Sequence, residues 1–130
     1  MILLDTHVVI WMMTDPDRLS ARSREAILRA RIEHESLAYS PVTIYEIAYS
    51  ARRRRLSLST RVENFIAAIE KRLRPAPLTT PIAVCAAGLP EPFHGDPMDR
   101  IIVATAIVED CALLTADTKI HSSGACRVIW

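Results

Sequence analysis

The stretch Met-Ile-Leu-Leu-Asp-Thr-His, residues 1–7, decides the fold class. Its apolar run, residues 2–4, is typical of a short strand buried on both faces, and it ends at the acidic residue Asp5. Residues 6–13 continue as an apolar helix of about two turns. A buried strand that passes directly into a helix indicates a parallel α/β fold.

The same alternation of strand and helix continues along the chain. Strands are predicted over residues 37–39, 111–114 and 127–130, the last of them at an edge of the sheet. Two helices are predicted to begin after the caps Ser20 and Ser40, the second with Pro41 at its first position. Three more are predicted over residues 60–73, 81–88 and 98–109. The pattern predicts a three-layer α/β/α domain with a central parallel sheet of about four to five short strands and right-handed crossovers.

Length and composition predict a single domain over residues 1–130, with enough apolar residues for its own core. The net charge of +1 excludes a protein that coats nucleic acid through a broad positive surface. Fourteen Arg against two Lys nevertheless favour local, forked contacts to phosphate. The three cysteines lack the spacing of a zinc site or a disulfide framework. Residues 2–13 are too short to span a bilayer and lack a basic leader, so we expect a soluble intracellular protein.

Four acidic residues are expected to meet at one edge of the sheet. Asp5 and Asp117 each follow a predicted strand, where ligands of parallel α/β folds gather. Glu46 and Asp99 lie near the starts of two predicted helices that point to the same edge. Crowded carboxylates repel one another unless a cation neutralises them, and Mg²⁺ or Mn²⁺ prefers such oxygen ligands. This arrangement predicts a divalent-metal site suited to phosphodiester hydrolysis.

Each acid also has an ordinary explanation, which is favoured when that acid is considered alone. Asp5 and Asp117 can cap the turns that follow them, Asp99 with Asp96 resembles a capping box, and a lone helical Glu46 is usually solvated. Two other functions therefore remain open. One is a non-catalytic RNA- or protein-binding module that keeps the acids for architecture. The other is a Mg²⁺-dependent phosphoryl acceptor in which Lys119 contacts phosphate.

Four ordered motifs resemble PIN-domain proteins, with the closest likeness to VapC toxins, and they span nearly the whole chain. They read LLDTH (residues 3–7), SPVTIYEIAYSARRRRL (residues 40–56), GDPMDRIIVATA (residues 95–106) and LLTAD (residues 113–117). The resemblance assigns the metal-binding, catalytic quartet to Asp5, Glu46, Asp99 and Asp117. It places Thr115 beside the metal as a polar support, and it makes Asp96 the helix cap rather than a ligand.

The resemblance also implies an activity and partners. PIN-domain toxins are metal-dependent ribonucleases, so we expect a Mg²⁺- or Mn²⁺-dependent ribonuclease that acts as the toxin of a type II toxin-antitoxin pair. The antitoxin's carboxyl-terminal segment would lie across the acidic groove, and its amino-terminal part would bind DNA, so DNA contact would be indirect. A homodimer built through helices, a cytoplasmic location and no membrane contact are likewise implied.

The sequence leaves open whether residues outside the acidic quartet contact RNA. Four consecutive arginines at the predicted helix end suit RNA phosphate or, equally, a solvated helix terminus: Arg52, Arg53, Arg54 and Arg55. Trp11 and Trp130 suit base stacking, although packing is favoured. His7 and His94 neighbour motif acids and are expected to make local hydrogen bonds, and His34 and His121 to lie at the surface. The sequence does not identify the RNA target.

Overall fold

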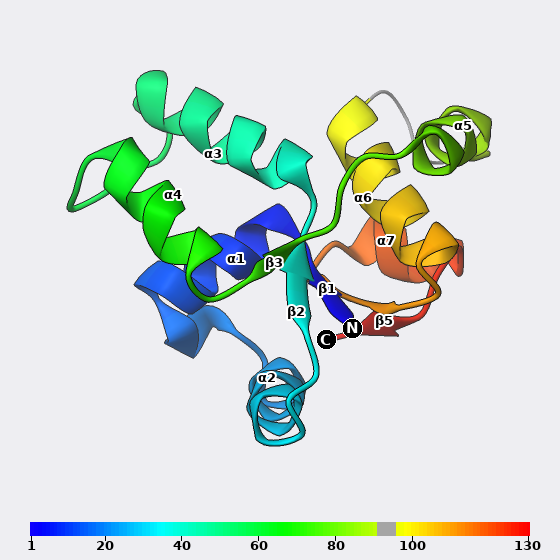
Figure 1. Cartoon of the computed structure of the whole chain (residues 1–130), viewed down its shortest axis with the longest axis horizontal. Helices are drawn as coiled ribbons and strands as arrows, with labels where there is room; N and C mark the ends of the chain where they lie inside the picture. Colours follow the sequence, from blue (N-terminus) through cyan, green and yellow to red (C-terminus); the bar gives the residue numbers. More distant parts are fainter. Residues whose placement is uncertain (91–95) are drawn as a thin grey trace.

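A computed structural model describes residues 1–90 and 96–130, and it contains a five-stranded parallel sheet in the order β3-β2-β1-β4-β5 (Figure 1). The strands are β1 (Ile2–Leu4), β2 (Leu37–Tyr39), β3 (Arg74–Pro75), β4 (Ala112–Leu114) and β5 (Val128–Ile129). Helices cover both faces of this sheet, which confirms the predicted three-layer α/β/α architecture.

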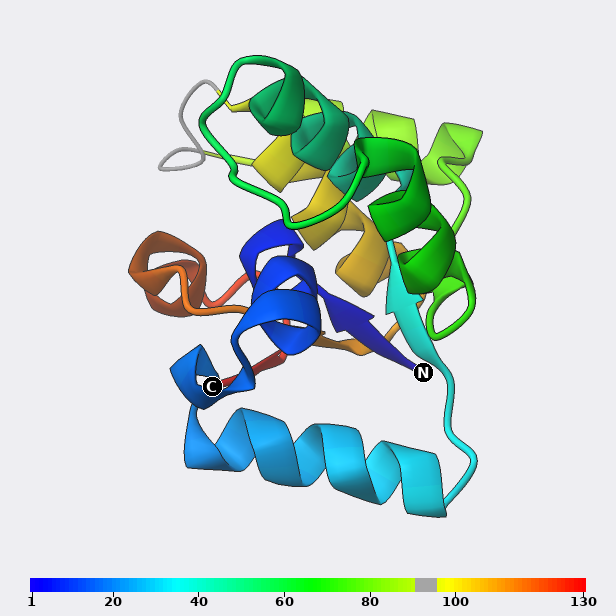
Figure 2. The same cartoon turned by 90° about the vertical axis from the view of Figure 1, so that its left-hand side faces the viewer.

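The predicted helices occur in the predicted order, and one further helix lies near the carboxyl end. They are α1 (Thr6–Thr14), the 3₁₀ turn η1 (Pro16–Arg18), α2 (Ala21–Ile32), α3 (Pro41–Arg52), α4 (Val62–Glu70), α5 (Thr80–Gly88), α6 (Pro97–Val108) and α7 (Thr118–Ser123). Ser20 caps α2 as expected, because its Oγ accepts a hydrogen bond from the Ser23 amide at 3.0 Å. In Figure 2, α2 lies apart from the other helices, along the lower edge of the molecule.

Alternation along the strands divides the core between the two faces of the sheet. In β1, Ile2 and Leu4 join the core beneath α1, α3 and α4, whereas Leu3 points to the opposite core beneath α6 and α7. All three side chains are at most 5% exposed, as a central strand requires. β1 pairs with β2 on one side and β4 on the other, with Leu4 opposite Tyr39 and Leu114. The carboxyl ends of these three strands therefore lie side by side.

Four local predictions need correction. The helix predicted over residues 60–73 is shorter, and α7 was not predicted. The extended segment that follows Leu73 forms β3 at the edge of the sheet, where Pro75 lacks an N–H that a central strand would need. Ser40 occupies the cap position of α3, but its hydroxyl makes no capping hydrogen bond and has no partner within the described part of the chain.

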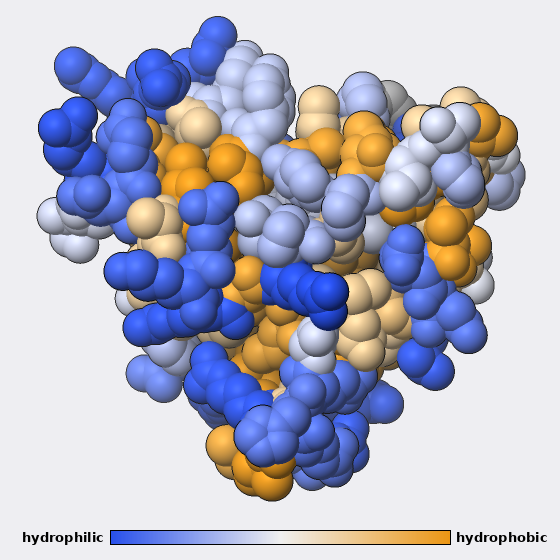
Figure 3. All heavy atoms as spheres, in the orientation of Figure 1, coloured by the Kyte–Doolittle hydropathy of each residue, from blue (hydrophilic) through white to orange (hydrophobic). Residues whose placement is uncertain are grey.

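The surface combines charged and apolar areas (Figure 3). Hydrophilic side chains dominate near the ends of α3 and α4, and apolar side chains emerge on α2, where Leu28 and Ile32 are 59% and 69% exposed. The three cysteines are free thiols. Within residues 1–90 and 96–130, no helix combines the length and the apolar character needed to cross a membrane.

Candidate metal centre

A pocket of about 460 Å³ opens at the carboxyl edge of the sheet. Its walls come from the residues that directly follow β1 and β4, from α1, η1 and α3, and from the start of α6. The lining residues are Asp5, His7, Trp11, Arg18, Glu46, Asp96, Asp99, Ala116 and Asp117. All four acids of the predicted quartet thus line one pocket, although their roles there stay a prediction.

Asp5 is the most deeply placed acid, only 6% exposed. Its Oδ1 accepts the Thr6 amide at 2.7 Å, which caps α1, and its Oδ2 accepts the Thr115 hydroxyl at 2.6 Å. Burial raises the pKa of the Asp5 carboxyl, and the hydrogen bonds from Thr115 and Thr6 partly offset that increase. Capping and pocket placement therefore coexist, and the second oxygen is held in place by Thr115, a residue 110 positions away that directly follows β4.

Asp117 lies at the end of β4 and starts α7. Its Oδ1 accepts the amides of Lys119 at 2.7 Å and Ile120 at 3.3 Å, which accounts for the unpredicted helix. The Asp117 amide donates to the Thr115 hydroxyl oxygen at 3.0 Å. Thr115 is fully buried, so one hydroxyl links the backbone of Asp117 to the carboxylate of Asp5. Thr115, which was expected to be a polar support near the acids, thus donates a hydrogen bond to Asp5.

Glu46 projects from the second turn of α3 and is half-buried. Burial raises the pKa of its carboxyl, a hydrogen bond from the Thr6 hydroxyl opposes this, and the nearby charges of Asp5 and Asp96 raise it further. Thr6 and Thr43 are both buried, with their hydroxyl oxygens 3.1 Å apart. The Thr6 hydroxyl therefore lies within hydrogen-bonding distance of the Thr43 hydroxyl on α3, the helix that carries Glu46.

Sequence reasoning missed this pair of threonines. The signal was present, since Thr6 directly follows Asp5, and Thr43 precedes Glu46 by three positions on the same helical face. Two hydroxyls therefore orient two acids: Thr115 orients Asp5, and Thr6 orients Glu46.

Asp99 lies in the first turn of α6, where the charges of four other carboxylates act on it. Burial, followed by the charges of Asp96, Asp5, Glu46 and Asp117, raises its pKa to about 7. Within the described residues, no hydrogen bond to the Asp99 carboxylate offsets this increase. The capping-box explanation thus lacks its characteristic hydrogen bond, and the carboxylate faces other carboxylates instead.

Asp96 caps α6 as predicted, with its Oδ1 accepting the Met98 amide at 3.0 Å. Its carboxylate also approaches two quartet members: one oxygen each of Glu46, Asp96 and Asp99 lie within 4.8 Å of one another. Only Asp96 of the three is exposed. Oxygens from all three residues can therefore reach one cation. Asp96 caps α6 and also lies within the acidic cluster.

Aromatic and basic side chains line the same pocket as the acids. The Trp11 ring lies between the His7 ring, at 5.9 Å between centroids, and the Trp130 ring, at 5.8 Å. The Arg18 guanidinium carbon sits 4.4 Å from the Trp11 ring centroid. Trp11, Trp130 and the other side chains of the nearby core pack together, as the sequence favoured. His7 lowers the pKa of both Asp5 and Glu46 through its charge.

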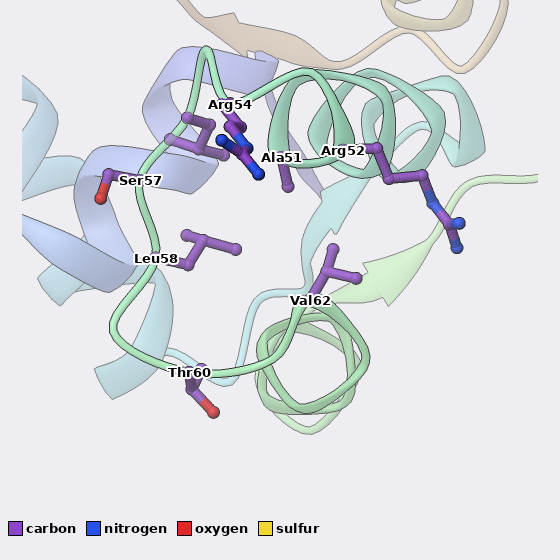
Figure 4. A pocket seen from close by; sticks show the side chains of 8 residues that line it. Ala51, Arg52, Arg54, Ser57, Leu58, Thr60 and Val62 are labelled. Atoms are coloured by element: carbon purple, nitrogen blue, oxygen red, sulfur yellow. The ribbon is translucent and has the colours of Figure 1, made fainter.

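The arginine run does not line this pocket. Arg52 and Arg54 line a different cavity of about 470 Å³ between the end of α3 and the start of α4. Figure 4 shows Arg54 at the rim of this second cavity, while the Arg52 guanidinium points away from it. Arg53 stacks on Tyr49 at 3.7 Å, and Arg55 is exposed. Any RNA contact by this run would be distant from the acids along the surface.

The surface positions predicted for two histidines are confirmed. His121 and His34 are exposed, as predicted, although the His121 Nε2 also lies 2.8 Å from the Thr115 carbonyl oxygen. His94 lies outside the described residues.

The fold and pocket define a class of protein: a parallel α/β domain with carboxylates gathered where the central strands end. The PIN domain family matches residues 2–124, and the chain belongs to that family.

Particular relatives agree with this membership. The chain is 35% identical over 121 residues to "Ribonuclease VapC22" from Mycobacterium tuberculosis (strain ATCC 25618 / H37Rv), covering 93% of this chain and 90% of the relative. In structure, it is similar to VapBC2 from Rickettsia felis bound to a DNA fragment from its promoter, with a TM-score of 0.72, 15% identity, and coverage of 98% and 97%. It is also similar to a toxin-antitoxin complex from Klebsiella pneumoniae, with a TM-score of 0.69 and 20% identity. That match covers 100% of this chain and 97% of the other. These two structures support the fold.

Proposed function

We propose that this protein is a ribonuclease that hydrolyses RNA phosphodiester bonds with Mg²⁺ or Mn²⁺ held by Asp5, Glu46, Asp99 and Asp117. The observation that carries the proposal is the convergence of these acids, from four separate segments, on one pocket. The sequence similarity to a relative named as a ribonuclease supports the substrate class.

The residues present fit a hard divalent cation. Carboxylate oxygens are the ligands that Mg²⁺ and Mn²⁺ prefer, and no soft ligand lines the pocket in the described part of the chain. Burial and then the charges of the neighbouring carboxylates raise the pKa of Asp99 to about 7, and a cation would neutralise that negative charge. When bound by these acids, such an ion would activate a water and stabilise negative charge on the phosphodiester.

The protein's own contribution is orientation. Thr115 holds one oxygen of Asp5 and leaves the carboxylate facing the pocket, while Thr6 holds Glu46. Capping hydrogen bonds fix the backbone at Asp5, Asp96 and Asp117, so the acids need little reorganisation when the ion binds. Asp96 serves this arrangement as the cap that directs Asp99 inward.

We further propose that the chain is one PIN domain over residues 1–130, acting in the cytoplasm as the toxin of a type II toxin-antitoxin pair. The names of its structural relatives, VapBC and toxin-antitoxin complexes, support an antitoxin partner. The antitoxin would occupy the acidic groove and would carry any DNA contact. A homodimer through the helices near residues 52–55 completes the proposal.

Metal dependence is tested with purified protein and labelled cellular RNA. Cleavage should require Mg²⁺ or Mn²⁺, stop in excess EDTA and resume when metal is restored. Equal cleavage in EDTA would contradict the proposed metal role. No cleavage under any condition, with RNA still bound, would favour the non-catalytic module. Transfer of a labelled phosphoryl group to the protein would favour the phosphoryl acceptor.

A further inference from the structure

We infer that Arg18 binds a backbone phosphate of the RNA substrate and that Trp11 is the positioning residue that holds it there. This inference rests on the proposed function and adds a substrate-binding group outside the acidic quartet. It also differs from the RNA contact that the arginine run, residues 52–55, suggests from sequence.

The local backbone places Arg18 at the pocket. The turn η1 follows directly after α1 and reverses the chain, with the Arg18 amide donating to the Asp15 carbonyl at 3.1 Å. This reversal sets the Arg18 guanidinium over the Trp11 ring, one turn from the end of α1, at 4.4 Å from the centroid. Trp11 is itself only partly exposed and packs against Trp130. The arginine is therefore supported by a ring that is anchored in the fold.

The charge distribution of the pocket gives Arg18 a distinctive role. Five acidic side chains line this pocket, and in residues 1–90 and 96–130 Arg18 is the single Lys or Arg among the lining residues. An RNA strand that approaches such a surface is repelled unless a cation meets its phosphates. The metal can neutralise the phosphate at the acids, but neighbouring phosphates need another positive charge. Arg18 supplies that charge within the same pocket.

The donors of Arg18 remain available to a phosphate. Arg18 makes no ion pair with any described residue. The neighbouring Arg24, in comparison, pairs with Asp17 at 3.9 Å. A guanidinium over an aromatic ring is held through its face, which leaves its N–H groups at the edge. Those groups form the forked hydrogen bonds that suit phosphate oxygens. Trp11 thus restricts Arg18 without using its hydrogen-bonding capacity.

The inference is tested by binding of a short, labelled single-stranded RNA to full-length protein carrying Asp5→Asn, which keeps the RNA intact. Adding Arg18→Gln should weaken binding about tenfold, the value expected for one charge-assisted hydrogen-bonded contact. It should also reduce the slope of log affinity against log salt by about 0.7, the contribution of one phosphate contact in a single strand. Arg18→Lys should retain part of the binding.

Arg61→Gln is the matched control, because Arg61 is exposed at the start of α4, pairs with Glu63 and lies outside the acidic pocket. It removes the same charge and should leave affinity and salt slope near the parent values. Trp11→Leu should weaken binding when Arg18 is present and have no further effect on Arg18→Gln. If Arg18→Gln and Arg61→Gln bind RNA alike, the inference is wrong.

A second measurement locates the contact. A neutral methylphosphonate is placed at one linkage of the RNA at a time, and affinity is measured for each position. At the linkage that Arg18 contacts, the methylphosphonate should lower the affinity of the parent protein. The same modification should leave the affinity of the Arg18→Gln variant unchanged. Equal losses in both proteins at every linkage would overturn the inference.

Cleavage by otherwise wild-type protein in Mg²⁺ is measured in parallel. Active protein whose cleavage is unchanged by Arg18→Gln would overturn only the Arg18 inference. Protein that neither cuts nor binds RNA would overturn the proposed function as well.

Discussion

The two sides of the acidic pocket are built differently. On one side, Asp5 and Asp117 follow adjacent strands and are joined through the Thr115 hydroxyl by hydrogen bonds of 2.6 and 3.0 Å. On the other side, Glu46 and Asp99 project from helices beside Asp96, with oxygens within 4.8 Å of one another. On the strand side, hydrogen bonds link the two acids through Thr115, whereas on the helix side three carboxylates lie close together and Asp99 accepts no hydrogen bond from the described residues.

This difference indicates how the fold tolerates so many acids in one pocket. Buried carboxylates with donors keep their orientation without a cation, as Asp5 does with Thr6 and Thr115. Asp99 has no such donor in the described residues, and its pKa rises to about 7. The strand side therefore provides geometry, and the helix side provides the electrostatic attraction for a cation. Four predictions test this division.

The largest effect is expected from Asp5→Asn on the strand side. Asn keeps the size and the capping oxygen but removes the charge that would bind the metal. Cleavage should fall at least about 100-fold, because even a residue that only supports a metal ligand is worth about 10–100-fold. Rates are measured on labelled RNA, and folding is checked by circular dichroism. A folded variant that cuts at the wild-type rate would remove Asp5 from the catalytic residues.

Thr115→Val should give the next largest effect. It removes the donor to Asp5 and the acceptor for the Asp117 amide, so metal affinity and cleavage should each fall about 10–100-fold. Loss of a buried hydrogen-bonding group should also lower the free energy of unfolding by about 1–3 kcal/mol. Calorimetric Mn²⁺ titration and urea unfolding measure these changes.

Thr105→Val provides the control for Thr115→Val. Thr105 is also buried, but its hydroxyl donates at 2.7 Å to the Ile101 carbonyl within α6 and touches no acid. It should retain metal affinity and cleavage. Comparable loss of metal affinity in both variants would mean that the strand side is not selectively held by Thr115.

A smaller effect is expected from Asp96→Asn on the helix side. Asn can still cap α6, so only the negative charge near Asp99 and Glu46 is lost. Metal affinity should fall less than about tenfold, as expected for a charge that does not itself bind the ion. The pKa of Asp99 should decrease, which carbon NMR of the carboxyl group measures. A loss as large as that of Asp99→Asn would make Asp96 a metal ligand.

The smallest effect concerns the stability of metal-free protein. The Asp99 pKa is raised from 3.8 to about 7, so between these values the folded state holds a proton that the unfolded state has released. The free energy of unfolding therefore falls as pH rises through this window. Asp99→Asn removes this penalty. Above pH 7, it should be more stable than wild type by about 1 kcal/mol after solvent screening, or about 4 °C in Tm.

Thermal unfolding in EDTA at pH 5 and pH 8 measures this difference, which should be larger at pH 8. Asp17→Asn is the control, because its side chain is fully exposed outside the pocket. A stability gain from Asp99→Asn that is equal at both pH values would show that charge repulsion is not its cause.

Several elements were predictable because their signals are local. The apolar run Ile2–Leu4 followed by a capping Asp5 appears as β1 and α1, and Ser20 caps α2. Proline after the cap position marks the starts of both α3 and α6. Short-range sterics and capping fix these features, so they can be read from neighbouring residues.

Other features depend on residues distant in sequence. Helix α7 has six residues and little apolar periodicity, and it depends on the Asp117 cap and on Ile120 buried in the core. Ser40 has a capping position without a capping bond, which composition does not reveal. The approach of Asp96 to Glu46 brings the start of α6 to α3, although the two residues lie 50 positions apart in the sequence. Local pattern carries no information on such distances.

The sequence by itself determined the strand-helix order, the membership of the PIN domain family and the four acids to be considered together. Only the tertiary structure decided which donor holds each acid and which basic residue faces them. Thr115 meets Asp5 because β4 pairs with β1, and Arg18 reaches the pocket because η1 turns back over Trp11. The physical reason is range: propensity and capping act within a few residues, whereas electrostatic and hydrogen-bonding partners are set by chain packing.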